Sequence, residues 1–147
     1  MRHHLLLVLS LIATCAQAQL STQVLKSAGV AVGECNDEYS EWCLYNGDPV
    51  KVFSSDAYGA YVALDEWAGL AVKFKEEYGS YLPIKNEVHY PSYVSDLTDY
   101  SNLHMAVNAG SAWVKVTREY TTLEGSFRLV LSMTKGSYIV MVLDVAK

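Results

Sequence analysis

The sequence predicts an α+β domain in which a long amphipathic helix packs on a curved antiparallel sheet and a short helix precedes both. The first observation is a helical spacing of apolar residues over positions 56–78, and the second is an alternation with period two from position 103 onward. The third is composition, because 147 residues with 51% hydrophobic side chains are enough for one core. We therefore expect a single globular domain.

Residues 1–18 have the pattern of a secretory signal peptide. A basic start at Arg2 is followed by an apolar run, and Ala16 and Ala18 form the small-residue pair that signal peptidase recognises. The apolar run is too short to cross a hydrocarbon core of about 30 Å as a helix. We expect cleavage after Ala18, a secreted extracellular domain of residues 19–147, and no membrane anchor.

Cysteine usage indicates an oxidising compartment. Cys35 and Cys43 remain after the expected cleavage, and an even pair in a secreted protein is expected to form a disulfide. This bond would close part of an acidic and aromatic loop over residues 34–48, in which Asn46 and Gly47 mark a tight turn. The acidic neighbours disfavour a reactive thiol, because a thiolate needs a positive environment.

Two short elements are predicted before the long helix. Residues 20–32 have a helical spacing of apolar side chains, with Ser21 available as a cap and Gly33 at the end. Residues 50–53 follow a proline and are typical of a short strand. The domain is therefore expected to begin with a short helix and a short strand.

The long helix is predicted over residues 56–78. Ser55 or Asp56 can cap its first turn, and Gly79 stands at the position after its last turn, where glycine is favoured. The apolar residues of this helix fall on one face: Ala60, Leu64, Trp67, Ala71, Phe74 and Tyr78. That face is expected to pack on the sheet.

The C-terminal part of the chain is predicted to form an antiparallel meander. An edge strand over residues 85–90 precedes it, in a stretch that prolines interrupt. The predicted meander strands are residues 103–107, 112–120, 127–134 and 138–145. The last strand is apolar on both faces, so it should be central, with the long helix on one face and a second copy of the domain as a candidate cover for the other.

This order of elements resembles the NTF2-like superfamily, in which the sheet wraps around the helices as a cone. The resemblance spans residues 20–147 and rests on element order and on the strands SAWVKVTREY, GSFRLVLSMT and GSYIVMVLDV. It implies an apolar pocket between helix and sheet, and a homodimer formed through the outer sheet face. The cystatin-like fold is a more distant alternative, but the Q-x-V-x-G loop of those protease inhibitors is absent from the sequence.

No catalytic or metal-binding motif is found in the sequence. His89 and His104 lack the spacing of a zinc site, and no cofactor is predicted. Asp96 and Asp99 lie beside tyrosines, where an acid in an aromatic pocket can take part in proton transfer. Turn capping is the favoured interpretation of that pair, and whether the chain is an enzyme stays open.

Charge and aromatic content indicate the function class. A formal net charge of −5 argues against nucleic-acid binding, and 11 Tyr with 3 Trp suit a binding surface. The candidate binding residues are Trp42, Tyr45, Trp67, Tyr90, Tyr93 and Tyr100. We expect a secreted, non-enzymatic protein that holds a small apolar ligand or a partner surface against the concave sheet face. The alternatives are an NTF2-like enzyme using Asp and His, and an extracellular effector that binds a protein.

Overall fold

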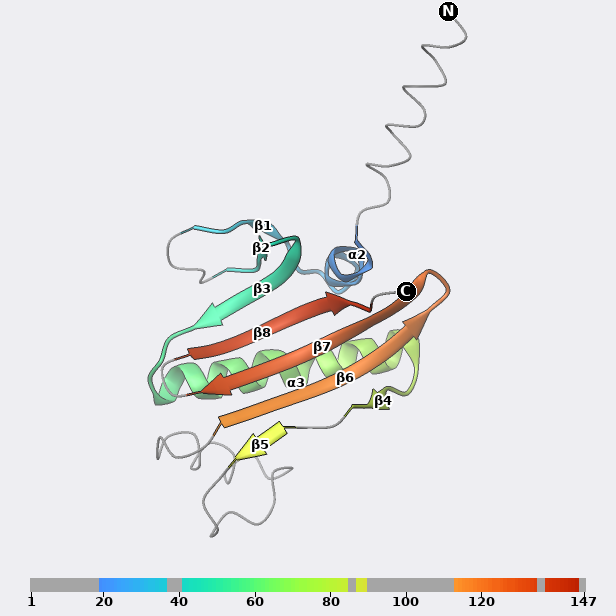
Figure 1. Ribbon diagram of the computed structural model, residues 1–147. Helices are drawn as coiled ribbons and strands as arrows, with labels where there is room; N and C mark the ends of the chain where they lie inside the picture. Colours follow the sequence, from blue (N-terminus) through green and yellow to red (C-terminus); the bar gives the residue numbers. More distant parts are fainter. Residues whose placement is uncertain (1–18, 37–40, 85–86, 90–112, 135–136, 146–147) are drawn as a thin grey trace, which may run out of the picture.

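A computed structural model describes residues 19–36, 41–84, 87–89, 113–134 and 137–145. Within these residues, two helices accompany an eight-stranded mixed sheet (Figure 1). The predicted α+β class is therefore confirmed. The predicted signal peptide, residues 1–18, and the predicted strand over residues 103–107 lie outside the described residues.

Helix α2 (Leu20–Ser27) is shorter than the predicted helix because Gly29 ends it. Gly29 has a φ of +84°, a conformation that glycine adopts without the steric cost of a Cβ. The Gly29 N–H donates to the Lys26 carbonyl and the Val30 N–H donates to the Leu25 carbonyl, both at 3.0 Å. This pair of bonds is the Schellman closure of a helix.

The N-terminus of α2 is held by a residue far away in the sequence. Gln19 is the N-cap and its side chain makes no capping bond. Ser21, predicted as the cap, instead lies in the first turn, where its N–H and its hydroxyl donate to the two Asp144 carboxylate oxygens at 2.9 and 3.1 Å. A carboxylate at a helix N-terminus is favourable because it satisfies free N–H groups and opposes the helix dipole.

Helix α3 (Ala57–Tyr78) confirms the predicted long helix. The Asp56 carboxylate caps it by accepting from the Gly59 N–H at 2.8 Å, and the Gly79 N–H donates to the Lys75 carbonyl at 2.9 Å beyond its last turn. Gly59 is required because a Cβ there would collide with the Ser54 carbonyl oxygen. The predicted cap and the predicted terminal glycine are both confirmed.

The sheet has one interior strand that is apolar on both faces. The order along the sheet is β1 (Gly33–Glu34), β2 (Cys43–Tyr45), β3 (Asp48–Phe53), β8 (Ser137–Asp144), β7 (Gly125–Thr134), β6 (Trp113–Thr122) and β4 (Leu82–Pro83), with β5 (Glu87–His89) also paired to β6. Strand β8 lies between β3 and β7, as its apolar character predicted. Strands β6, β7 and β8 form the predicted antiparallel meander.

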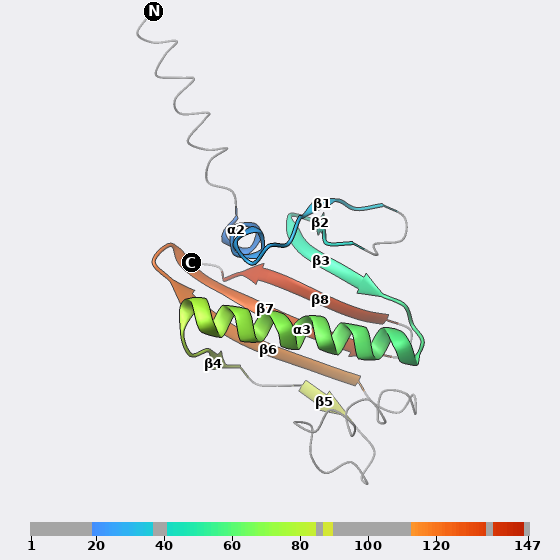
Figure 2. The same ribbon diagram turned by 180° about the vertical axis from the view of Figure 1, so that it is seen from behind.

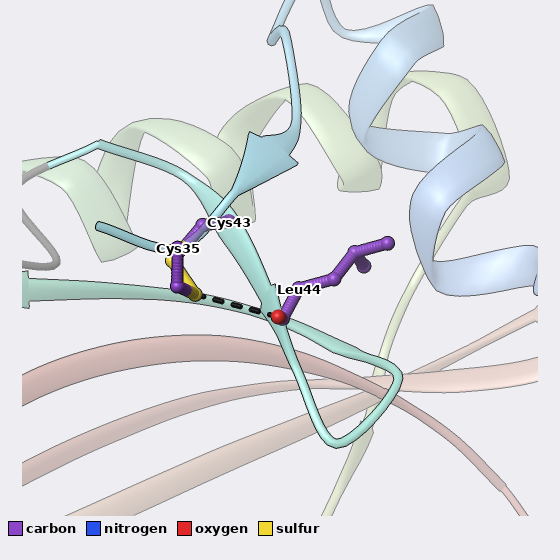
Figure 3. Close-up of a disulfide and its surroundings, with 3 residues drawn as sticks. All are labelled: Cys35, Cys43 and Leu44. Atoms are coloured by element: carbon purple, nitrogen blue, oxygen red, sulfur yellow. Dashed lines mark hydrogen bonds between the residues drawn. A yellow bond between two sulfur atoms is a disulfide. The ribbon is translucent and has the colours of Figure 1, made fainter.

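Two expectations about the sheet were wrong. The segment predicted as a loop over residues 34–48 contains strand β2, and the sheet is not antiparallel throughout because β1 pairs with β2 in parallel. The disulfide between Cys35 and Cys43 explains both features, since it holds the chain that leaves β1 beside the start of β2. Figure 3 shows that the Cys35 sulfur also lies against the Leu44 carbonyl oxygen, at 3.4 Å. This is a polar contact, because an oxidised sulfur carries no hydrogen to donate.

The core lies between the sheet and the two helices. Helix α3 runs across β6, β7 and β8, and α2 contacts β3, β7 and β8 (Figure 2). Phe127, Leu129, Leu131 and Met133 of β7 share the helix-facing side and are completely buried, as the alternation predicted. Opposite them, α3 contributes buried Ala63, Leu64, Leu70 and Phe74. Described side chains therefore fill the centre of the helix–sheet interface.

Removal of the disulfide should destabilise the fold without abolishing it. The bond spans a sequence separation of 8, and the chain-entropy treatment gives about 2.5 kcal/mol for a loop of this size. We expect Cys35→Ala/Cys43→Ala to lower the free energy of unfolding in urea by about this amount. The wild type treated with dithiothreitol should behave like the double variant. Equal midpoints for the oxidised wild type and the double variant would contradict the stapling role.

The cap of α3 predicts a pH dependence of stability. The hydrogen bond from the Gly59 N–H, followed by that from Ser54, holds the pKa of Asp56 below its ordinary value of 3.8. A lowered pKa means that the ionised cap stabilises the fold fully above pH 3.8 and stops doing so as the pH falls through the lower, folded value.

We therefore expect the difference in stability between the wild type and Asp56→Asn, which keeps an acceptor but no charge, to shrink on acidification. Urea unfolding between about pH 6 and about pH 2 measures this difference. Asp56→Ala serves as a control that loses the acceptor as well and should stay less stable than Asp56→Asn. A difference that does not change with pH would be inconsistent with a charged cap.

Candidate functional site

Trp42, predicted as a binding residue, lies inside the protein. It is 4% exposed and belongs to the main core cluster. Its indole N–H donates to the Glu66 carboxylate of α3 at 2.8 Å. Trp42 therefore attaches the segment that carries the disulfide to the side of α3.

The other predicted residues are distributed differently. Tyr45 is 53% exposed at the turn between β2 and β3, beside Leu44, which is 44% exposed. His89 lies in β5, paired with Trp113. Several candidates lie outside the described residues, namely Tyr90, Tyr93, Tyr100, Asp96, Asp99 and His104. Among the candidates that the structure describes, no catalytic constellation is brought together.

Trp67 contributes to a polar and aromatic arrangement that we call the arginine slot, defined by Trp67, Tyr81 and Arg118. The Arg118 guanidinium carbon lies 5.4 Å from the centre of the Trp67 ring and 4.8 Å from the centre of the Tyr81 ring. Contacts of this kind contribute about 0.5–2 kcal/mol each, more where water is excluded. The guanidinium is thus held between two aromatic side chains, one from α3 and one from the segment after it.

The fold places these three side chains together by simple means. Gly79 ends α3, the chain reverses, and β4 pairs with β6 so that Pro83 lies opposite Arg118. Tyr81 precedes β4 and packs on Tyr120 with ring centres 6.1 Å apart. On β6, Arg118 is in register with Leu129 of β7, and so it lies on the helix-facing side of the sheet.

The slot brings together several hydrogen-bond donors. Trp67 Nε1 is buried and finds no acceptor among the described residues. Leaving a buried donor unpaired costs about 1–3 kcal/mol. Arg118 Nη1 donates to the Thr117 carbonyl at 3.2 Å. Chemically, the slot offers an indole N–H and a cation, both on an aromatic background, to an acceptor such as a carboxylate.

Tyr120 next to the slot shows how dry this edge of the core is. Its hydroxyl donates to the Ala71 carbonyl at 3.2 Å. Burial is the main cause that raises the pKa of Tyr120 to about 12, so the phenol stays protonated. The neighbourhood of Arg118 is therefore one in which a charge interacts strongly with any partner of opposite sign.

Sequence reasoning identified Trp67 but missed Tyr81 and Arg118. The signal was present in the alternation of β6, where Val114, Val116, Arg118 and Tyr120 share one face. A single arginine on an otherwise apolar face is an exception that points to a specific contact.

Other kinds of site find no support in the described residues. No group of three or more His, Cys, Asp or Glu among them is arranged to hold a metal ion. Neither of the described helices combines the length and apolar character of a membrane span. No protein-family model, curated protein or solved structure matches the chain.

The contact between Trp42 and Glu66 can be tested by substitution. Glu66→Ala should leave the buried indole N–H without its acceptor and lower the free energy of unfolding by about 1–3 kcal/mol. Glu66→Gln keeps an oxygen acceptor and should lose less. Urea unfolding followed by circular dichroism measures both variants. If Glu66→Gln proved as destabilised as Glu66→Ala, the hydrogen bond would not be the relevant contact.

Proposed function

We propose that the protein is a small, secreted, non-enzymatic binding domain whose ligand is an apolar molecule with a carboxylate or similar anionic acceptor, held at the arginine slot. The observation that carries the proposal is the buried Trp67 N–H, which has no acceptor among the described residues and lies in the indole ring over which the Arg118 guanidinium is placed. A ligand carboxylate would accept from the Trp67 N–H and lie close to the positive charge of Arg118. The disulfide between Cys35 and Cys43 is compatible with the extracellular location that the proposal includes.

The surroundings of the slot indicate the apolar character of the ligand and the side of the sheet on which it would lie. Trp67 and Tyr81 present aromatic surface around Arg118, and large apolar and aromatic walls with few polar groups are typical of small-molecule sites. In an NTF2-like cone, the ligand lies between the helix and the concave face of a curved sheet. Arg118 lies on the helix-facing side of β6, the side that such a ligand would occupy.

A second candidate function is favoured by one separate observation. Leu44 and Tyr45, the last two residues of β2, are adjacent, large and exposed. Tyrosine is enriched among the residues that dominate protein–protein binding. An effector that binds a protein partner would use this end of β2 and would not depend on Arg118.

The ligand class can be tested with dodecanoate and dodecanol, which share a chain length and differ in charge. We expect dodecanoate to bind more tightly by about tenfold, because a charge-assisted hydrogen bond contributes about 1.5–3 kcal/mol. Arg118→Gln should remove this preference, and Arg118→Lys should retain part of it because the charge remains but the planar stack is lost. Calorimetry or competition against a fluorescent fatty acid measures the affinities.

Arg128→Gln is the matched control. Arg128 is the other arginine among the described residues and pairs with Glu119 at 3.1 Å on the outer side of the sheet. Replacing Arg128 should leave the preference for dodecanoate over dodecanol unchanged. Equal binding of the two probes, or equal effects of the two arginine variants in samples with wild-type circular dichroism, would exclude the slot. Sedimentation of the same samples tests the homodimer expected from the sequence.

A further inference from the structure

Two hollows, neither of them lined by a residue of the arginine slot, adjoin at the C-terminal end of α3. One has a volume of about 350 Å³ and lies between α2 and α3, and the other has a volume of about 470 Å³ and lies between α3 and the turn that joins β6 to β7. Both are lined by Glu77 and Tyr78, so they meet at the last turn of the helix. We call the two hollows together the terminal groove.

The floor of the terminal groove is apolar and firmly held. Tyr78 packs on Phe74 and on Phe127, with ring centres 6.1 and 5.5 Å apart, and Val24 of α2 extends the floor on one side. On the other side, Leu123 at the tip of the turn between β6 and β7 is fully exposed. A leucine in solvent at the wall of a groove adds apolar surface that a partner can cover.

The rim of the groove is negative. Glu76, Glu77 and Glu124 line it, against a single lining lysine, Lys73, which donates to the Ala28 carbonyl at 3.2 Å. The C-terminal end of α3 adds the partial negative charge of its free carbonyls. Burial, followed by Glu77 and Glu124, raises the pKa of Tyr78, as expected for a phenol in a negative field.

The charge and the open form of the groove select its occupant. Both hollows are open to solvent, whereas small-molecule sites enclose most of their ligand, so a segment of chain fits better than a free small molecule. A second copy of this protein is a poor partner because the chain carries a net charge of −5. We propose that the terminal groove binds a basic, amphipathic segment of another protein, whose apolar side chains cover Tyr78 and Leu123 while Lys or Arg pairs with Glu77 and Glu124.

The test uses the amidated peptide KLKWKLK as the probe. Calorimetry and amide chemical-shift changes should show micromolar to millimolar binding, with shifts centred on the last turn of α3 and the turn between β6 and β7. Glu77→Lys/Glu124→Lys should weaken binding by about tenfold or more, because complementary charges become repulsive. Leu123→Ser, at a fully exposed position, should weaken binding severalfold without loss of folding.

Matched controls separate docking from general attraction between opposite charges. Glu34→Lys/Glu41→Lys makes the same change of net charge at exposed positions in and after β1, outside the groove. In a buffer with enough salt to screen long-range charge, this variant should bind the peptide with an affinity within about twofold of the wild type. The peptide KGKGKGK, with the charges but no apolar side chains, should bind much more weakly. Equal effects of the two acidic pairs, equal binding of the two peptides, or shifts elsewhere would overturn the proposal. None of these outcomes depends on the arginine slot.

Discussion

The contact of Phe74 with Phe127 and Tyr120 is the interaction on which the rest of the structure depends. The Phe74 ring lies 5.0 Å from Phe127 and 5.6 Å from Tyr120, centre to centre, with edge-on geometry that aromatic pairs favour. All three side chains are at most 1% exposed. They join α3 to β6 and β7, the strands across which the helix runs (Figure 2).

The same aromatic cluster sets out the two candidate sites. Tyr78 packs on Phe127 and ends at the terminal groove, whereas Tyr81 packs on Tyr120 and ends beside Arg118. The two tyrosines lie on either side of Gly79, where the chain leaves the helix and turns back toward β4. The C-terminus of α3 therefore places one tyrosine ring at each site. Gly79, predicted from the sequence to end the helix, lies between these two tyrosines in the chain.

Local rules predicted what local interactions determine. The cap at Asp56, the stop at Gly79 and the interior position of β8 follow from neighbouring residues and from periodicity. The end of α2 was misplaced because glycine occurs at two nearby positions, and the one at Gly29 adopts the left-handed conformation. The capping of α2 by Asp144 lies beyond local rules, since 123 positions separate Asp144 from its partner in the sequence. The arginine slot required the pairing of β4 with β6, which no pattern in the sequence specifies.

Arg118 and Trp67 are the residues that most clearly depart from the rules obeyed by the rest of the core. An apolar side chain at position 118 would match its neighbours Val116 and Tyr120 and avoid the cost of removing a guanidinium from water. The Trp67 N–H adds a second cost, because it is buried without an acceptor among the described residues. An arginine on an apolar face and an indole N–H without an acceptor among the described residues are both departures from the pattern of the core, and such departures are expected at functional sites. Both departures lie at the side of the core where α3 faces β6, whereas the centre of the helix–sheet interface follows the apolar pattern without exception among the described residues.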